Sequence, residues 1–224
     1  MKPSMQAILF DMDGLMIDTE SISGQSWLRA AAEVGVEIPE AVILGMVGLS
    51  VTKSLDYVAA HFQDRTLAET LSQHCRRHYR ELLTHGELKL KPGIIEVLDW
   101  VESRALPHAV ATSTQRQMCD LKLRRSGLGP YFQHTVAGDE VANTKPAPDV
   151  YLAAAARLNI QPANCIVLED SLTGMQAGLA AGMRVILVPD MEKPEAHQTS
   201  DALAVCDDLH QALQLLKTLS HPAK

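Results

Sequence analysis

The chain has 224 residues, of which 46% are hydrophobic and 21% are charged, and its formal net charge is -7. This composition supports one large core, or one core with a smaller inserted domain, and it lacks the basic excess of a nucleic-acid-binding protein. No apolar run reaches the roughly 18 to 20 residues needed to span a bilayer, so we expect neither nucleic acid nor membrane as a partner.

Short apolar runs alternate with helical patterns along the chain, which predicts an α/β fold with a largely parallel, Rossmann-like sheet and helices on both faces. Each run is too short for a helix and ends at a polar residue or at a glycine or proline. The expected strands are Ala7–Phe10, His108–Thr112, Thr135–Ala137, Cys165–Leu168 and Arg184–Val188.

The segment between the first two expected strands has a different character. It contains no strand pattern and predicts helices over about Gly24–Gly35, Val51–Phe62 and Leu67–His85. Thr66 is the expected N-cap of the last helix, because Glu69 follows three residues later as in a capping box. We therefore predict a helical insertion of residues 20–87 in an α/β core of residues 1–19 and 88–224, with the core resuming at Pro92-Gly93 and a helix from Ile94 to about Arg104.

The four cysteines are scattered and form no CxxC pair, which indicates neither a zinc site nor a disulfide framework. The segment Met1–Phe10 is too short for a secretory signal. We therefore expect reduced thiols and a cytoplasmic protein.

The first expected strand ends in two carboxylates, Asp11 and Asp13, followed by Gly14. At a spacing of two residues their side chains tend to point the same way, and two close carboxylates need a cation or a shared proton. A hard divalent cation suits such a pair, with one carboxylate as nucleophile and the other as general acid/base. The alternative is a solvated or helix-capping pair.

The second expected strand ends in hydroxyls, Thr112-Ser113-Thr114, before a helix expected from about Gln115. Hydroxyls and backbone N–H groups at a helix N-terminus form an anion site. A plain Ser/Thr N-cap is the alternative, and this motif alone favours it.

A third motif is the loop Thr144–Asp149, in which prolines flank Lys145 and a helix then begins. Its lysine is a compact positive charge that can hold a phosphate and offset the repulsion between phosphate and carboxylate. The alternative is a surface lysine, but a loop stiffened by prolines favours a positioned group.

A fourth motif follows the buried run Ile166-Val167-Leu168, which ends in Glu169 and Asp170 before another helix. The alternative reading is an acidic cap that complements the helix dipole. All four motifs fall at strand ends, where ligands bind in open α/β sheets, so together they predict one site.

The order of these motifs, DxDG, VATST, KPAPD and EDSLTG, resembles the haloacid dehalogenase-like superfamily over nearly the whole chain. The helical insertion after the first motif resembles the cap domain of the β-phosphoglucomutase and sugar-phosphatase branch. The resemblance implies that Asp11 is the nucleophile, Asp13 the acid/base, and Thr112 and Ser113 the phosphate ligands. It also implies that Lys145 neutralises charge and that Mg²⁺ is bound by Asp11, the Asp13 carbonyl and Asp170, with Glu169 adjacent.

Within the family, the second acid Asp13 disfavours a dehalogenase or a phosphonate hydrolase. The β-phosphoglucomutase pattern has a cap arginine where this chain has Val51, and a histidine where it has Ser23. Lys53 is two places off and lacks the bidentate fork of arginine. The sequence therefore favours a phosphatase acting on a small phosphorylated metabolite, a sugar or polyol phosphate, with the mutase as the alternative.

The cap is expected to set specificity, because it closes over the site and excludes water. Glu20 and Ser23 are candidate substrate contacts, and Trp27 is either a third or a residue of the cap core. A non-catalytic phosphate-binding regulatory protein is a remote alternative, since no catalytic group is missing. We expect a monomer.

Overall fold

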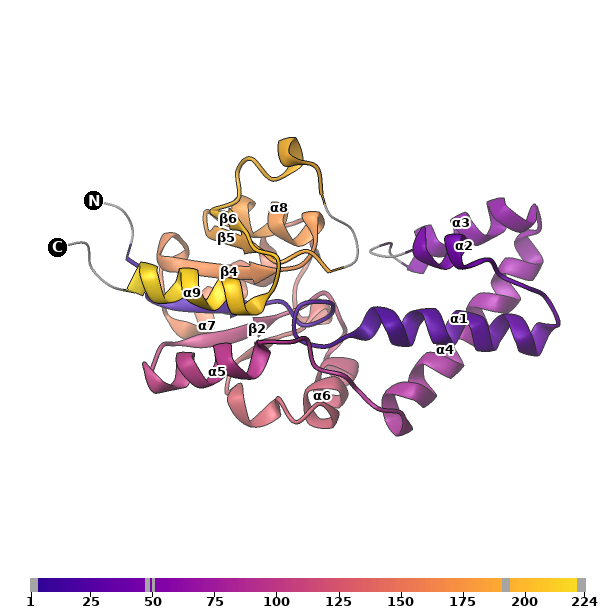
Figure 1. Cartoon of the computed structure of the whole chain (residues 1–224), viewed down its shortest axis with the longest axis horizontal. Coiled ribbons are helices and arrows are strands. Elements are labelled where there is room, and N and C mark those ends of the chain that lie inside the picture. Colours follow the sequence, from indigo (N-terminus) through magenta and orange to yellow (C-terminus); the bar gives the residue numbers. More distant parts are fainter. Residues whose placement is uncertain (1–3, 47–48, 50, 191–193, 221–224) are drawn as a thin grey trace. The chain divides into compact units, whose positions relative to one another are not determined.

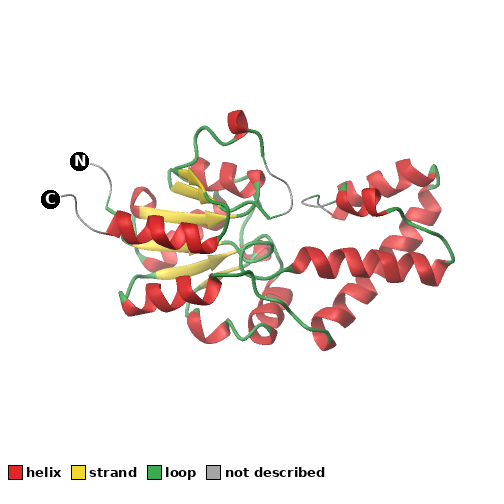
Figure 2. Cartoon of the chain, in the orientation of Figure 1, coloured by secondary structure: helices red, strands yellow, loops and turns green. Residues whose placement is uncertain are grey.

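The structure is a computed structural model that describes residues 4–46, 49, 51–190 and 194–220. Its contacts group into two compact units, residues 1–17 with 89–224 and residues 18–88. The first unit is an α/β unit, and the second is built from helices (Figure 2).

The α/β unit is built on a parallel sheet (Figure 1). In the described residues its strand order is β3-β2-β1-β4-β5-β6. The bounds are β1 (Ala7–Phe10), β2 (His108–Ala111), β3 (Thr135–Val136), β4 (Cys165–Glu169), β5 (Arg184–Leu187) and β6 (Ala204–Val205). All five predicted strands are therefore confirmed, whereas β6 was not predicted, although it lies within the apolar run Ala202–Cys206.

The central strand β1 pairs with β2 on one side, with Leu9 opposite Ala109, and with β4 on the other, with Leu9 opposite Val167. Every residue of β1 and β4 is buried, as expected for strands covered on both faces. From β1 the chain adds strands in one direction and then crosses back to β4. This reversal creates a switch point beside β1, where open α/β sheets bind their ligands.

Helices cover both faces of the sheet (Figure 1). On one face α5 (Ile94–Ser103) packs against α9 (Leu209–Ser220), and on the other α7 (Asp149–Leu158) packs against α8 (Leu172–Ala180). A further helix, α6 (Arg116–Arg125), follows β2. The predicted α/β fold with helices on both faces is thus confirmed.

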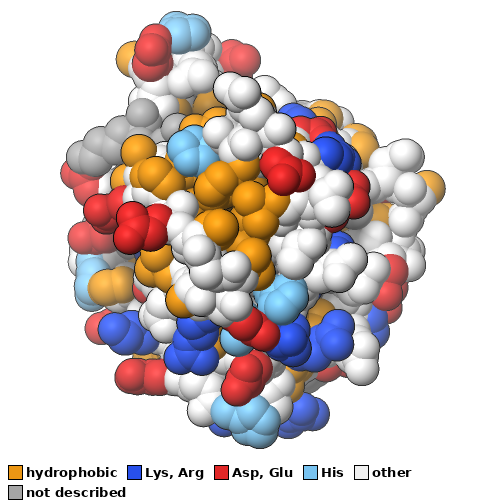
Figure 3. All heavy atoms as spheres, turned by 90° about the vertical axis from the view of Figure 1, so that its right-hand side faces the viewer, with side chains coloured by type: hydrophobic (Ala, Val, Ile, Leu, Met, Phe, Trp, Pro, Cys, Tyr) orange, Lys and Arg blue, Asp and Glu red, His pale blue; other side chains and the backbone are white. Residues whose placement is uncertain are grey.

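The helical unit contains α1 (Thr19–Val34), α2 (Glu40–Leu44), α3 (Val51–Phe62) and α4 (Arg65–His85). Its own core includes Trp27, Val58 and Leu71, so Trp27 is a core residue of this unit. Leu28, Leu44, Leu49 and Tyr57 are its exposed large hydrophobic residues, and Figure 3 shows hydrophobic side chains gathered on one face.

Two helix starts differ from the prediction. Helix α1 begins at Thr19 because the Asp18 carboxylate accepts from the Ser21 N–H at 3.1 Å. Helix α4 begins at Arg65, because the Asp64 carboxylate accepts from the Leu67 N–H at 3.0 Å. Thr66 therefore lies inside the helix, and its prediction as the N-cap was wrong. Helix α2 was not predicted.

None of the described helices combines the length with the apolar character that crossing a bilayer requires. All four cysteine thiols are free and buried.

Candidate active site

The turn after β1 carries both aspartates of the first motif. The Asp11 N–H continues the sheet by donating to the Leu168 carbonyl oxygen at 3.0 Å. The chain then turns at Gly14, whose φ of +82° lies in the left-handed region that favours glycine. A Cβ at Gly14 would lie 2.1 Å from Asp170 Oδ2, so the close approach of the two motifs also requires glycine there.

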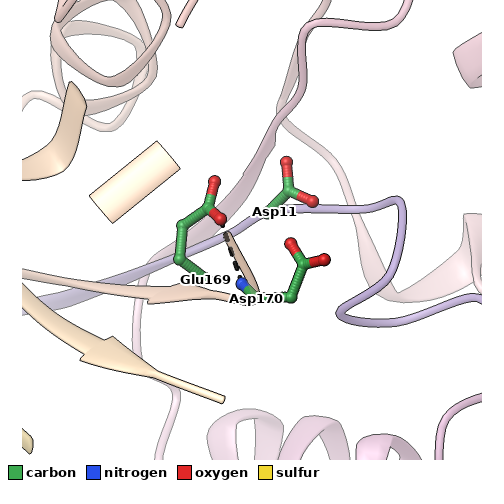
Figure 4. Close-up of side chains that lie close together, drawn as sticks. All are labelled: Asp11, Glu169 and Asp170. Atoms are coloured by element: carbon green, nitrogen blue, oxygen red, sulfur yellow. Dashed lines mark hydrogen bonds between the residues drawn. The ribbon is translucent and has the colours of Figure 1, made fainter. Parts of the chain in front are cut away.

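Three carboxylates meet at the switch point, from the ends of β1 and β4 (Figure 4). Asp11, Glu169 and Asp170 each offer one oxygen, and these oxygens lie within 4.8 Å of one another. The Asp170 N–H donates to Glu169 Oε2 at 3.0 Å, which orients the two neighbours. An all-oxygen donor set of this kind suits a hard divalent cation such as Mg²⁺.

Lys145 joins this group from the loop before α7. Its ammonium donates to Asp11 Oδ1 and, at 2.6 Å, to Glu169 Oε1. The Lys145 side chain is only 6% exposed, and its Nζ lies 4.8 Å from the centroid of the Tyr151 ring. The Tyr151 hydroxyl in turn donates to Glu169 Oε1 at 2.8 Å. The lysine is therefore held in place by two carboxylates and an aromatic face.

The buried charges shift one another's pKa values. Burial raises the pKa of Asp11 to about 7, against the opposing effect of Lys145. Burial, with Glu169 and Asp11 nearby, raises the pKa of Asp170 well above its ordinary value. Burial opposes ionisation of Glu169 too, but Lys145 outweighs it and lowers the pKa of Glu169.

This pattern reflects three carboxylates, two of them buried and Asp170 half-buried, against the ammonium of Lys145, whose own pKa the carboxylates raise despite its burial. Two acids that resist ionisation indicate an excess of negative charge that a bound cation would relieve. The residues present therefore fit Mg²⁺.

The hydroxyl motif lies after β2, which neighbours β1. Thr112 is buried and its Oγ1 accepts from the Thr114 N–H at 3.1 Å, whereas Ser113 is exposed. Gly138 supports this loop: its N–H donates to the Thr114 carbonyl at 2.8 Å, and a Cβ there would lie 2.1 Å from the Ser113 carbonyl oxygen. Thr112 and Ser113 thus reach the same edge of the sheet as Asp11.

Asp13 has two partners that the sequence did not reveal, as Glu169 and Lys145 have Tyr151. The Asp13 Oδ2 accepts from Thr114 Oγ1 at 2.6 Å and its Oδ1 from Lys122 Nζ at 2.6 Å. Lys122 is 4% exposed. A signal was present: Lys122 falls three residues after the buried Cys119 and beside the buried Leu123, on the stripe of α6 that faces inward.

The predicted cap contacts lie in the helical unit. Glu20 and Ser23 are on α1, and both are half-buried. Their part in substrate binding stays a prediction. Of the stretch compared with the mutase pattern, Val47, Gly48, Ser50 and the side chain of Val51 lie outside the described residues.

Known proteins are similar to this chain in sequence and in fold. Residues 8–188 match the family model of haloacid dehalogenase-like hydrolases. The chain is 34% identical over 183 residues to the phosphorylated carbohydrates phosphatase of Thermotoga maritima, with 81% of this chain and 84% of that protein covered. It is 30% identical over 179 residues to the fructose-1-phosphate phosphatase YqaB of Escherichia coli, with 80% and 94% covered.

The fold has close counterparts among solved structures. A HAD family hydrolase of Deinococcus radiodurans, solved with bound phosphate and sodium, superposes with a TM-score of 0.80 at 28% identity. The superposition covers 100% of both chains.

Proposed function

The chain belongs to the haloacid dehalogenase-like hydrolase family, as its motifs predict, and on this premise we propose that it is a magnesium-dependent phosphatase of small phosphorylated metabolites. The observation that carries the proposal is the contact of Lys145 with both Asp11 and Glu169, beside Asp170. A buried nucleophile next to a fixed ammonium and a cation site is what phosphoryl transfer requires.

We assign the chemistry to two carboxylates. In the first step an Asp11 oxygen attacks phosphorus, the bond from phosphorus to the leaving oxygen breaks, and Asp13 gives its proton to that oxygen. In the second step Asp13 takes a proton from water, the water oxygen attacks phosphorus, and the bond to Asp11 breaks. The two steps release an alcohol and inorganic phosphate and restore both side chains.

The other groups hold charge in place. Asp11, the Asp13 carbonyl and Asp170 are the proposed ligands of Mg²⁺, with Glu169 adjacent, and the bound ion would neutralise charge on the phosphate oxygens. Lys145 neutralises charge on Asp11 and on the phosphate. Thr112 and the Ser113 backbone hold the phosphate at the end of β2.

We propose that the helical unit of residues 18–88 is the cap and that Glu20 and Ser23 contact the substrate. The preferred substrates are sugar or polyol phosphates. This choice is supported by the two relatives above, which are named as phosphatases of phosphorylated carbohydrates and of fructose 1-phosphate. A monomer in the cytoplasm completes the proposal, and the four free thiols are consistent with that location.

The test is phosphate release from a panel of phosphorylated sugars, polyols and nucleotides with Mg²⁺. β-Glucose 1-phosphate with its bisphosphate activator is run alongside to detect isomerisation. We expect release from a few sugar phosphates, loss of release in excess chelator, and no turnover by Asp11→Asn, whose far-ultraviolet circular dichroism stays that of the wild type. Isomerisation without release would favour the mutase instead, and turnover by Asp11→Asn would remove Asp11 as nucleophile.

A further inference from the structure

Both carboxylate oxygens of Asp13 are held by residues that follow β2. Lys122 of α6 donates to Oδ1 at 2.6 Å, and Thr114 donates to Oδ2 at 2.6 Å. The Lys122 ammonium also lies 3.5 Å from Thr114 Oγ1, so the three groups form one connected set. We propose that Lys122 is a positioning residue that fixes the acid/base Asp13 for hydrolysis of the aspartyl-phosphate. This inference rests on the proposed function.

The burial of Lys122 needs a reason. An ammonium that leaves water loses its hydration, and an acidic partner must compensate for that loss. Other cations of α6 avoid the problem: Arg124 is exposed, and Arg116 binds Glu140 and Asp120 at the surface. Lys122 is 4% exposed, and its acidic partner Asp13 is 28% exposed. Helix α6 therefore places the buried Lys122 ammonium against Asp13, the carboxylate that acts in both chemical steps.

The geometry of Asp13 explains why it needs holding. Asp13 lies beyond the end of β1 and directly before Gly14 with its φ of +82°, where its backbone forms an isolated bridge with Ile17 and is not part of a strand. A side chain at such a position has several rotamers open to it, and a misplacement of about 1 Å can cost on the order of a hundredfold in rate. Two donors from a different segment, more than 100 residues away in sequence, restrict that freedom.

Misplacement of the Asp13 carboxylate affects the two chemical steps differently. With 4-nitrophenyl phosphate the leaving group departs without needing a proton, so formation of the aspartyl-phosphate tolerates a misplaced Asp13. Attack by water still needs Asp13 as a base. Loss of positioning therefore slows the second step selectively, and the phospho-enzyme accumulates.

The experiment is stopped-flow release of 4-nitrophenolate with Mg²⁺ by wild type and variants. Lys122→Met keeps the length of the side chain and removes its charge. We expect a burst of about one nitrophenolate per enzyme, a kcat lowered about 10- to 100-fold, and no rise in KM. Lys122→Arg restores part of the rate. The control is Arg124→Met, an exposed cation of the same helix, which we expect to behave as wild type.

Two further variants keep the test decisive. Thr114→Val removes the donor to the other oxygen and is expected to give a smaller burst of the same kind, even if Lys122→Met fails to fold. In a double-mutant cycle, Lys122→Met adds little to Asp13→Ala, because the group that it positions is already gone. Additive losses, or folded Lys122→Met and Thr114→Val enzymes without a burst, would overturn the inference.

The design separates this inference from the proposed function. If wild type releases no nitrophenolate with Mg²⁺, the proposed function fails. If wild type turns over and Asp11→Asn does not, but neither variant accumulates phospho-enzyme, only the role of Lys122 fails.

Discussion

The hydroxyl of Tyr151 donates to the same oxygen of Glu169 that accepts from Lys145, at 2.8 Å and 2.6 Å respectively. Tyr151 is fully buried, and its ring also faces the Lys145 ammonium. Tyr151 is thus a buried core residue of α7 that also contacts the charged groups of the site, Glu169 and Lys145.

Tyr151→Phe is expected to lower the free energy of unfolding by about 1 kcal/mol, because one buried hydrogen bond is lost. We expect kcat to fall several-fold, since Glu169 and Lys145 lose a common support. Urea denaturation and steady-state kinetics measure the two effects. The control is Tyr131→Phe, whose hydroxyl donates to Asp99 at the surface, and whose removal is expected to leave kcat unchanged. Equal effects of the two substitutions on kcat would contradict the role given to Tyr151.

Mg²⁺ is expected to raise the melting temperature, because a ligand that binds only the folded state stabilises it by about 2.7 kcal/mol at a hundred times its Kd. Asp170→Asn is expected to abolish most of this rise, since it removes one of the three carboxylates that meet at the site. Asp207→Asn, at an exposed carboxylate, is the control and keeps the full rise. Differential scanning fluorimetry with and without Mg²⁺ measures it, and an unchanged rise in Asp170→Asn would remove that residue as a ligand.

Gly174→Ala is expected to damage the site by overpacking. A Cβ at this position would lie 1.7 Å from Glu169 Oε1, so the carboxylate that binds Lys145 must shift. We expect a loss of about 1–3 kcal/mol in stability and at least a tenfold loss in kcat. Gly129→Ala is the control, because its Cβ meets nothing closer than 3.6 Å. Wild-type kinetics in Gly174→Ala would show that Glu169 is free to move.

The ion pair between Glu140 and Arg116, which lies outside the candidate active site, is expected to make the stability of the fold depend on pH. Glu140 Oε2 accepts from Arg116 at 2.6 Å and from the Ala137 N–H at 2.8 Å, and the Arg116 hydrogen bonds lower the pKa of Glu140 from 4.5 to about 2. A carboxyl whose pKa is lower in the folded state stabilises the fold above its unfolded pKa, and this contribution is lost as pH falls toward about 2.

Glu140→Gln is therefore expected to cost about 1 kcal/mol at pH 7, a value kept small because the side chain is 30% exposed. The difference from wild type should begin to shrink below about pH 4.5. Urea denaturation between pH 7 and pH 3 measures it, with the exposed Glu102→Gln as control. A difference that grows on acidification would contradict the sign.

Much of this architecture is readable in the sequence, because hydrophobic runs that end in acids or hydroxyls mark buried parallel strands and the polar groups at their carboxyl ends. Asp11, Glu169 and Asp170 could be named for that reason, and Lys145 because prolines flank it in its loop. Lys122 could not be named from the sequence, since a lysine in a polar helix is ordinarily solvated. The one indication of its burial is that it shares a helix face with Cys119 and Leu123.

The first residue of α4 could not be chosen from the sequence either. Asp64 and Thr66 are both good N-cap residues, and Glu69 made Thr66 the better match to a capping box. The choice depends on which carboxylate or hydroxyl meets the free N–H groups, and that is a matter of backbone angles. Strand β6 was missed as well: it pairs with β5 at the edge of the sheet and lies within the apolar run Ala202–Cys206, which was not assigned to a strand.

The pairing of β1 also has a consequence for how the protein is made. Ile8 lies opposite His108 on one side and Ile166 on the other, so β1 is synthesised long before either of its partner strands. Loop closure over such separations is slow, and chains of this size commonly fold through intermediates. The chain must emerge from the ribosome beyond Asp170 before the carboxylates of Asp11, Glu169 and Asp170 can come together. Residues 18–88 can pack against one another while synthesis continues. Catalytic competence is thus a late event in the life of each chain.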